Sequence, residues 1–288
     1  DISASDISAS IPMGAYQSPC CGVEKTESPC KLSSRQPSHA PSPSTSRDSS
    51  CATFMDELEY GNAAGLNFVL HRPYAAEPPL PLLVFLHGFG ERGPEDGSQL
   101  ALVTRHGPWV SAALEHFVIA APQCPSGIWA SCADQVVEFV QHLAAEQLVD
   151  RDRIYLTGIS MGGFGTWAAA VAQPDLFADL VPICGGFTGP LPRGTSVPSV
   201  LRLAAQVPDV PSVARVWDLP AWLFHGRLDA TVSVAGSENC FSALGGESRG
   251  TSQLRLTVFE EARHDCWSVA YEDDELFPWV LQHRRSAI

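Results

Sequence analysis

A single serine, Ser160, lies at the centre of a glycine-rich turn that has Gly158 and Gly162 two residues away on either side. The apolar run before the turn predicts a strand over residues 154–156, and the run after it predicts a helix over residues 163–171. A strand, a sharp turn and a helix in this order are typical of a nucleophile elbow, whose strained backbone pushes the serine hydroxyl outward and tolerates only small neighbours. We therefore predict that Ser160 is a nucleophile rather than part of a flexible glycine-rich loop.

A serine hydroxyl is a poor nucleophile near neutral pH, so it needs a base to take its proton and a carboxylate to orient that base. Asp229 follows a predicted strand over residues 221–225, and His264 follows another over residues 254–259. Residues beyond the strand ends of an open parallel sheet surround the ligand. We expect Ser160, Asp229 and His264 to meet there as nucleophile, orienting carboxylate and base. The competing carboxylates and histidines are Asp209, Asp218, Asp265, His225 and His283.

Attack by a serine on a carbonyl places negative charge on the substrate oxygen, and this charge needs preorganised N–H donors. One expected donor is the main-chain amide of Met161, the residue after the nucleophile. The second is expected in the loop after the predicted strand 82–86, where Phe89 is best placed. His87 in the same loop is expected to tie the loop down rather than to act as a second base.

Strands alternate with helices along the part of the chain that carries these residues. Strands are predicted over residues 66–71, 82–86, 117–121, 154–156, 180–184, 221–225 and 254–259, and helices over 134–148, 163–171, 233–244 and 276–284. This alternation predicts an α/β fold with a mostly parallel sheet covered on both faces.

Residues 186–220 do not follow the alternation of strands and helices and form a long connection rich in Pro, Gly and Val. Long connections in compact domains are often lids or pocket loops, and the alternative is a surface insertion without a role. Trp129 lies in the loop between Cys124 and Cys132. We consider two roles for it, a wall of the substrate pocket together with the 186–220 segment, or a core residue.

Residues 1–50 are dominated by Ser, Pro and Ala and start with a direct repeat of Asp-Ile-Ser-Ala-Ser. Such a composition cannot bury enough apolar surface to offset its chain entropy, so a disordered leader is predicted, followed by a catalytic domain over residues 51–288. The leader lacks the basic start and apolar centre of a secretory signal. A cytoplasmic protein is favoured, and a processed organellar leader is the alternative.

The formal net charge of −14 argues against a nucleic-acid surface and against a polybasic membrane patch. The longest apolar runs are strand-sized, well short of the roughly 18 residues of a membrane span, so a soluble protein is expected. Among the nine cysteines, those beyond the leader show no metal-ligand spacing. Cys124 and Cys132 are close enough in sequence for a disulfide in an oxidising compartment, which leaves their redox state open.

Several motifs in a fixed order resemble one family of enzymes. They are Leu86-His-Gly-Phe-Gly-Glu-Arg-Gly93, Ala121-Pro-Gln-Cys-Pro125, the stretch from Arg153 to Trp167, Pro182-Ile-Cys-Gly-Gly186 and His264-Asp-Cys-Trp267. Over about residues 65–285 the chain resembles the predicted-peptidase group of α/β-hydrolases, which is similar to phospholipase/carboxylesterase and dienelactone-hydrolase-like proteins.

The resemblance implies an α/β-hydrolase fold with a mostly parallel central sheet of about eight strands, and a Ser160, Asp229, His264 triad. Arg263 stands where the family commonly has a glycine, so the loop before His264 departs from the family pattern. Dienelactone hydrolases proper carry a cysteine at the elbow, whereas Ser160 favours esterase chemistry.

The favoured function is a serine hydrolase that cleaves carboxylic esters through an acyl-enzyme, with a small-molecule ester or a short peptide as substrate. One alternative is a serine peptidase or amidase that uses the same triad. Another is a non-catalytic ligand-binding protein on a hydrolase scaffold. This chemistry requires no cofactor and no metal. The physiological substrate, the acyl-chain length and the oligomeric state stay open at this point.

Overall fold

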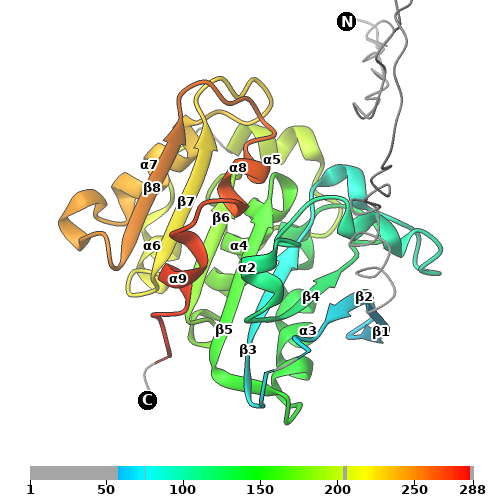
Figure 1. The fold of residues 1–288 in the computed structure, drawn as a ribbon. Helices are drawn as coiled ribbons and strands as arrows, with labels where there is room; N and C mark the ends of the chain where they lie inside the picture. Colours follow the sequence, from blue (N-terminus) through cyan, green and yellow to red (C-terminus); the bar gives the residue numbers. More distant parts are fainter. Residues whose placement is uncertain (1–57, 75, 204–205, 286–288) are drawn as a thin grey trace, which may run out of the picture. The chain divides into compact units, whose positions relative to one another are not determined.

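The computed structural model describes residues 58–74, 76–203 and 206–285. The leader predicted over residues 1–50 lies outside these ranges. The described residues form an eight-stranded sheet with helices on both faces (Figure 1). The strands are β1 (Glu59–Ala63), β2 (Leu66–His71), β3 (Leu80–Leu86), β4 (Val118–Pro122), β5 (Val149–Ile159), β6 (Asp179–Ile183), β7 (Ala221–Gly226) and β8 (Leu254–Phe259).

The strand order across the sheet is β1-β2-β4-β3-β5-β6-β7-β8. β2 pairs antiparallel with both β1 and β4, and all the other neighbouring strands are parallel. Every residue of β3, β4, β6 and β7 is buried, as expected for strands covered on both faces. The predicted α/β-hydrolase sheet, mostly parallel and of about eight strands, is confirmed.

The sequence patterns predict no strand at β1, and the structure shows why this strand is hard to recognise. Only Ala63 is buried among its five residues, so it lacks the alternation of apolar and polar residues that marks most strands. The hairpin to β2 turns at Ala64 and Gly65, whose φ angles are +50° and +74°. Two positive φ angles in a two-residue loop are characteristic of a type I′ turn, which matches the twist of the strands.

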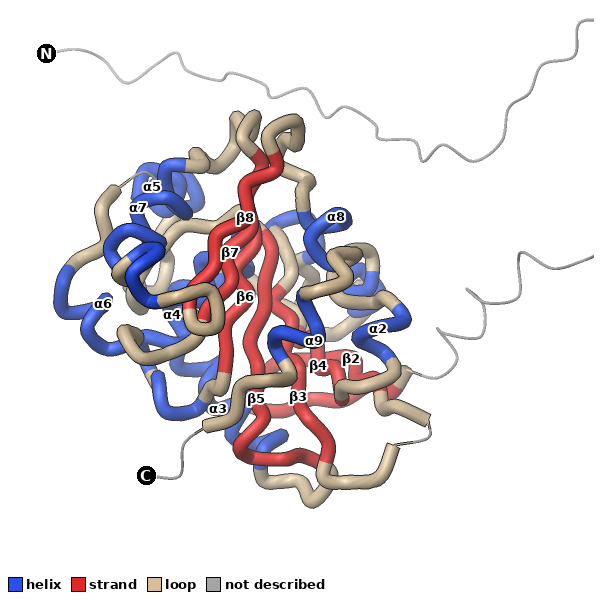
Figure 2. The backbone as a smooth tube through the Cα atoms, turned by 60° about the vertical axis from the view of Figure 1, so that its left-hand side comes forward, coloured by secondary structure: helices blue, strands red, loops and turns tan. Residues whose placement is uncertain are grey.

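The helices form two layers on opposite faces of the sheet (Figure 2). The α-helices are α2 (Ser111–Leu114), α3 (Ala133–Ala144), α4 (Met161–Ala172), α5 (Val197–Leu203), α6 (Val210–Arg215), α7 (Ala235–Ala243), α8 (Trp267–Tyr271) and α9 (Leu276–Val280). Helices α3 to α7 contribute to one apolar cluster, and α2, α8 and α9 contribute to the other. Short 3₁₀ helices η1 (Phe89–Glu91), η2 (Leu100–Thr104), η3 (Trp129–Cys132), η4 (Pro174–Leu176) and η5 (Gly246–Arg249) lie in the connections.

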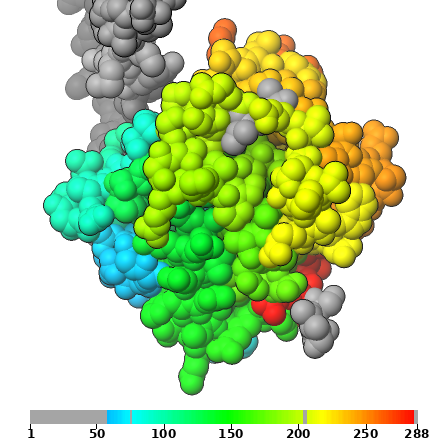
Figure 3. Space-filling view, turned by 180° about the vertical axis from the view of Figure 1, so that it is seen from behind, coloured from blue at the N-terminus to red at the C-terminus, as the bar shows by residue number. Residues whose placement is uncertain are grey.

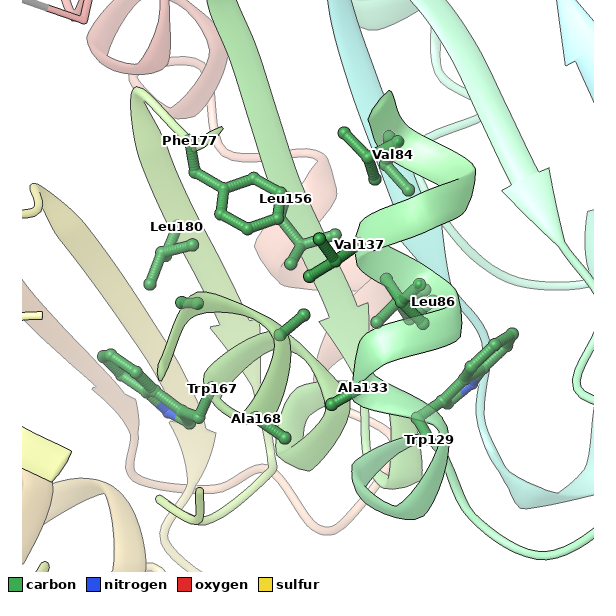
Figure 4. Packing of buried hydrophobic residues seen from close by; sticks show 14 of the residues in the cluster. Val84, Leu86, Trp129, Ala133, Val137, Leu156, Trp167, Ala168, Phe177 and Leu180 are labelled. Atoms are coloured by element: carbon green, nitrogen blue, oxygen red, sulfur yellow. The ribbon is translucent and has the colours of Figure 1, made fainter. Parts of the chain in front are cut away.

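The packing between the sheet and α3 and α4 forms the larger apolar cluster. Val84 and Leu86 from β3 and Leu156 from β5 lie beside Val137 of α3, and Ala168 of α4 lies close by (Figure 4). All of these side chains are at least nine-tenths buried. Burial of aliphatic side chains stabilises a fold by about 1.5–3 kcal/mol each, so this cluster holds β3, β5 and α4 rigidly together. These are the elements that flank the predicted elbow.

The 186–220 segment packs on the sheet domain instead of forming a loose surface loop. It contains α5 and α6, and Val200, Val213 and Val216 from it are buried in the larger cluster. Asp209 caps α6, because its side chain accepts a hydrogen bond from the Ser212 amide at 2.9 Å. Seen from behind, the described residues of the segment, in yellow-green to yellow, make up much of the upper surface (Figure 3).

Two predicted helices end earlier than the sequence patterns indicate. The helix predicted over residues 134–148 is α3, which ends at Ala144, and its last carbonyl accepts a hydrogen bond from the Arg151 side chain at 2.8 Å. The helix predicted over 276–284 is α9, which ends at Val280. A helix end of this kind depends on contacts from distant residues, which a local pattern does not contain.

Candidate active site

Ser160 lies in a tight turn between β5 and α4. Its φ angle is +52°, a conformation that non-glycine residues rarely adopt. A Cβ atom on Gly158 would lie 2.4 Å from the carbonyl oxygen of Gly162, and one on Gly162 would lie 1.8 Å from that of Leu86. Both positions therefore exclude any larger residue. This strained backbone presents the Ser160 hydroxyl at the carboxyl end of the sheet.

The side chains of Ser160, His264 and Asp229 form a continuous chain of hydrogen bonds. His264 Nε2 lies 2.8 Å from Ser160 Oγ, and His264 Nδ1 lies 2.6 Å from Asp229 Oδ2. Ser160 follows β5, Asp229 follows β7 and His264 follows β8, and the carboxyl ends of these three parallel strands lie at one edge of the sheet. The distances are those of a nucleophile, a base and an orienting carboxylate.

The Asp229 carboxylate is held by donors on both oxygens. Its Oδ1 atom accepts hydrogen bonds from the main-chain amides of Thr231 at 2.8 Å and Val232 at 2.9 Å. Burial raises the pKa of the Asp229 carboxyl, but hydrogen bonds from His225, His264 and the Val232 amide outweigh it and hold that pKa well below its usual value. Asp229 is therefore ionised at neutral pH and can accept a hydrogen bond from His264 Nδ1.

A second histidine, His225, contacts the same carboxylate from the buried side. Its Nε2 atom lies 3.2 Å from Asp229 Oδ2 and 3.0 Å from the carbonyl oxygen of Val232. Because both neighbours are acceptors, Nε2 carries the proton and donates, while Nδ1 lies 2.8 Å from the hydroxyl of Ser237. The sequence left His225 as an alternative to His264 for the role of the base. The structure places it behind Asp229, without access to Ser160, as a support for the carboxylate.

Two of the other competing residues, Asp209 and His283, lie away from Ser160. Asp209 caps α6, as described above. His283 Nδ1 lies 2.6 Å from Oδ2 of the buried Asp179, which stands at the start of β6, the end of that strand opposite to the active site. The spacing of His225 four residues before Asp229 was the available signal for its role, but the sequence alone does not show which histidine faces the nucleophile.

Phe89 and Met161 are the residues whose main-chain amides the sequence predicts as donors of an oxyanion hole. Phe89 is the first residue of η1 and Met161 is the first residue of α4. The amide N–H of a first helical residue has no acceptor within its own helix, so it is available to a ligand. Both residues line the same cavity as Ser160 and His264.

His87 anchors the loop that carries Phe89. Its Nδ1 atom donates to the carbonyl oxygen of Gly88 at 2.6 Å, and its Nε2 atom accepts from the main-chain amide of Cys124 at 2.9 Å. Burial lowers the pKa of His87 to about 4, so its ring is neutral at pH 7 and keeps this bonding pattern. His87 is thus a structural residue of the loop.

Trp129 lies in the apolar core. Its side chain is fully buried, and its indole N–H donates to the carbonyl oxygen of His87 at 3.0 Å (Figure 4). The cavity beside Ser160 is lined by its neighbour Ile128 instead. The pocket role considered for Trp129 therefore does not match its position. The physical reason is that η3 packs against α4, where a Cβ atom on Gly165 would lie 2.3 Å from Trp129 Cβ, while the indole reaches the His87 carbonyl.

Arg92 fixes the position of Phe89 from the outer side. Its guanidinium group lies 3.5 Å from the centre of the Phe89 ring, and its Nε atom donates to the Phe89 carbonyl oxygen at 3.2 Å. A third contact runs from its Nη1 atom to the carbonyl oxygen of Gly127 at 3.2 Å. The ring of Phe89, which is 45% exposed, stands at the entrance of the cavity as a result.

The cavity at Ser160 has a volume of about 320 Å³ and a mainly apolar lining. Ile128, Ile159 and Phe164 form part of its wall, and Trp267 stands edge-on to His264 with 5.7 Å between ring centres. From the 186–220 segment, α5 adds Val197, Val200 and Leu201. The segment therefore contributes a wall of the cavity, which is the pocket-loop role considered for it.

Cys124 and Cys132 are both free thiols in this structure. Within the described ranges, no group of three His, Cys, Asp or Glu side chains has an arrangement that could hold a metal ion. No helix in those ranges is both long and apolar enough to cross a lipid bilayer.

Comparison with known proteins agrees with this fold and chemistry. Residues 130–187 match the model of the prolyl oligopeptidase family. A poly(3-hydroxyalkanoate) depolymerase C from Paucimonas lemoignei is 28% identical, over 60% of this chain and 46% of that protein. The crystal structure of a thermostable esterase is also 28% identical, with a TM-score of 0.61 over 81% of this chain and 64% of its own. The chain thus spans less than two thirds of the length of both relatives.

A more distant structure shares the fold. An acylaminoacyl peptidase from Pyrococcus horikoshii is 16% identical and has a TM-score of 0.55 over 84% of this chain and 45% of its own. Together, the sheet topology and the likeness to the esterase structure show that this chain has the α/β-hydrolase fold.

Proposed function

We propose that this chain cleaves carboxylic esters through an acyl-enzyme formed on Ser160. The observation that carries the proposal is the hydrogen-bonded chain from Ser160 through His264 to Asp229, at 2.8 and 2.6 Å, beside an apolar cavity. A serine hydroxyl within hydrogen-bond distance of a histidine that is itself held by a carboxylate is the arrangement that nucleophilic acyl transfer requires.

Acylation starts when the ester carbonyl lies over Ser160 Oγ in the cavity. Oγ attacks the carbonyl carbon while His264 Nε2 takes the hydroxyl proton, and Asp229 stabilises the resulting imidazolium through its bond to Nδ1. The amides of Phe89 and Met161 donate to the oxygen that becomes negative. His264 then returns the proton to the leaving alkoxide, which departs as an alcohol and leaves the acyl group on Ser160.

Deacylation uses the same residues with water in place of the alcohol. His264 removes a proton from a water molecule, and the hydroxide attacks the acyl carbon. The tetrahedral intermediate then collapses as His264 returns the proton to Ser160 Oγ, releasing a carboxylic acid. Asp229 must stay ionised through both steps. Its depressed pKa supports that requirement at any pH near neutrality.

The relatives with the higher sequence identity to this chain support an ester as its substrate. The depolymerase and the esterase, both 28% identical to this chain, are by name enzymes that act on ester bonds. The cavity of about 320 Å³ lies at the lower end of ligand pockets and has few polar lining groups. Small aliphatic acyl or alcohol groups suit it better than extended polar peptides.

A peptidase or amidase is the second candidate, because the family model that matches residues 130–187 describes prolyl oligopeptidases. The same triad attacks an amide, provided that His264 protonates the leaving amine. The two candidates differ in the leaving group that the cavity positions, and neither needs a change in the residues described above.

The experiment compares p-nitrophenyl esters whose acyl groups have two to eight carbons with p-nitroanilides of acylated amino acids. It uses the purified chain and its Ser160→Ala variant. We expect kcat/KM for the esters to exceed that for the anilides by at least about 100-fold, with loss of on the order of 10⁴-fold or more in the variant. A preference for anilides would support the peptidase. Binding without turnover of either series would support a non-catalytic ligand-binding protein.

A further inference from the structure

A carboxyl group lies in the wall of the cavity, next to the proposed oxyanion loop, and the triad does not use it. Glu91 is the last residue of η1, is only 6% exposed and lines the cavity together with Ser160 and His264. Buried glutamates are uncommon unless other groups pair with them, because removing a carboxylate from water is costly. The environment of its two oxygens therefore indicates what this residue does.

No donor in the described part of the chain lies within hydrogen-bond distance of the Glu91 carboxyl oxygens. The Nε2 atom of His106 lies 3.8 Å from Oε1, beyond the range of a hydrogen bond. The hydrogen bond that Glu91 does accept goes to its main-chain carbonyl oxygen, from the Gln123 side chain at 2.9 Å. The backbone is fixed, and the carboxyl oxygens remain open to a donor from the cavity.

The carboxyl group lies against the loop that carries the proposed oxyanion amide of Phe89. A Cβ atom on Gly88 would lie 3.0 Å from Glu91 Oε2, so glycine at this position leaves room for the carboxyl group. Ile159, which precedes the nucleophile, packs on the same glycine position at 3.7 Å. Glu91 therefore faces the part of the cavity where a substrate bound at Ser160 must lie.

His106 closes the cavity on the far side of Glu91. Its ring contacts Trp267 at a tilt of 57° with 5.3 Å between ring centres, and Trp267 in turn stands edge-on to His264. Apart from Glu91, His106 and Thr231, the cavity wall around Ser160 and His264 consists of apolar side chains and glycines, and Glu91 is the one carboxyl group among these lining residues. A polar group on a bound substrate would thus find its acceptor at Glu91.

We infer that Glu91 is a specificity residue that accepts a hydrogen bond from a hydroxyl or protonated amine of the ester substrate. The inference rests on the proposed esterase function. A site built around a buried acceptor rejects an analogue that lacks the donor, because the carboxylate is then left unpaired in an apolar wall. The preferred substrates are accordingly short esters with one donor group near the scissile bond, on the acyl or the alcohol side.

The test uses esters that differ only in the donor. On the alcohol side, propyl butanoate is compared with 2-hydroxyethyl butanoate and 2-(dimethylamino)ethyl butanoate. On the acyl side, p-nitrophenyl butanoate is compared with p-nitrophenyl 3-hydroxybutanoate. We expect kcat/KM in the wild-type chain to favour a donor ester over its apolar partner by at least about 10-fold in one of the series. The Glu91→Leu variant is expected to bring that ratio to about 1 or below.

The variants also distinguish the two kinds of donor. Glu91→Gln keeps an acceptor oxygen without the charge, so a preference for hydroxyl esters survives in it and a preference for the dimethylammonium ester is lost. Both outcomes support the inference. Glu95→Leu is the matched control, since Glu95 is exposed in the loop after η1 and does not line the cavity. Its ratios should equal those of the wild-type chain.

Two results would overturn the inference. One is a wild-type chain that shows no preference for donor esters in either series, and the other is a preference that persists unchanged in Glu91→Leu. If Glu91→Leu does not fold, Glu91→Ala, which also lacks an acceptor, replaces it in the same comparison.

The same ester pairs are also compared by calorimetry in the Ser160→Ala background, where their dissociation constants are measured. This comparison reports on the subsite without turnover. A failure of the esterase proposal is thereby distinguished from a failure of the Glu91 inference. Equal affinities for donor and apolar esters in that background would count against Glu91, whatever the rate of hydrolysis.

Discussion

The indole N–H of Trp129 donates a hydrogen bond to the main-chain carbonyl of His87, at 3.0 Å, and the two rings meet at an angle of 65°. This contact joins a tryptophan of the core to the loop that carries Phe89. The position of one proposed oxyanion amide therefore depends on a side chain that does not line the cavity. Core packing and catalysis are linked at this point of the molecule.

Trp129→Phe should separate the hydrogen bond from the packing. The variant leaves the His87 carbonyl without its donor, so we expect the free energy of unfolding to fall by about 1–3 kcal/mol and kcat to fall several-fold. Trp129→Ala should cost about 3–5 kcal/mol of folding free energy. In both variants the preference among p-nitrophenyl esters of different acyl length should stay as in the wild-type chain. A changed length preference in Trp129→Phe would restore the pocket role for this residue.

Acidification should destabilise the chain through His87. The pKa of His87 is about 4 in the folded chain because of burial, whereas an unfolded histidine has a pKa of 6.5. Between these two values the unfolded state binds more protons, so the stability present above pH 6.5 is lost as the pH falls, by about 3 kcal/mol in total. His87→Gln cannot titrate in this range. Chemical denaturation from pH 7 to pH 4 should show a steeper loss in the wild-type chain, and parallel curves for the two proteins would contradict this role.

His225 should act as a positioning residue for Asp229. His225→Leu removes the Nε2 donor at 3.2 Å from Asp229 Oδ2, and we expect kcat to fall by roughly 10–100-fold with little change in KM, as for other residues that orient a catalytic group. His225→Gln offers an amide donor at a similar position and should recover part of the rate. A rise in KM without a fall in kcat, or equal kcat values in His225→Leu and His225→Gln, would indicate that His225 only fills space.

The α5 wall should set the length of the acyl or alcohol group that the cavity accepts. Val197→Trp places a large side chain at the cavity wall, so kcat/KM should fall by about 10-fold or more for octanoate esters and much less for acetate esters. The control is Val207→Trp in the same 186–220 segment, because Val207 is 75% exposed and does not line the cavity. A similar length profile in both variants would exclude α5 from the substrate site.

The sequence predicts those features of the molecule that depend on local patterns. Continuous apolar runs are sufficient to locate β3 and β7, because a strand buried on both faces needs no polar residue. The glycines around Ser160 locate the turn, since only glycine fits the backbone at positions 158 and 162. The order of Ser160, Asp229 and His264 along the chain follows from strand ends that share one edge of the sheet.

The features that depend on distant contacts were not predictable in the same way. Trp129 could be assigned to the core only once η3 was seen to pack on α4. Glu91 resembles any polar loop residue in the sequence, and its burial results from Gly88 and His106 being brought together by folding. For His225, a spacing of four residues from Asp229 allowed two roles, and only the direction of its ring decides between them.

The most direct test of the account is to trap the acyl-enzyme. A slowly deacylated ester, p-nitrophenyl trimethylacetate, is mixed with the chain, the release of p-nitrophenol is followed in the first turnover, and the protein is then digested and sequenced by mass spectrometry. The account predicts a burst of about one equivalent and one acyl group, attached to Ser160, with neither in Ser160→Ala. An acyl group on another residue such as Cys132, or a full burst in Ser160→Ala, would contradict it.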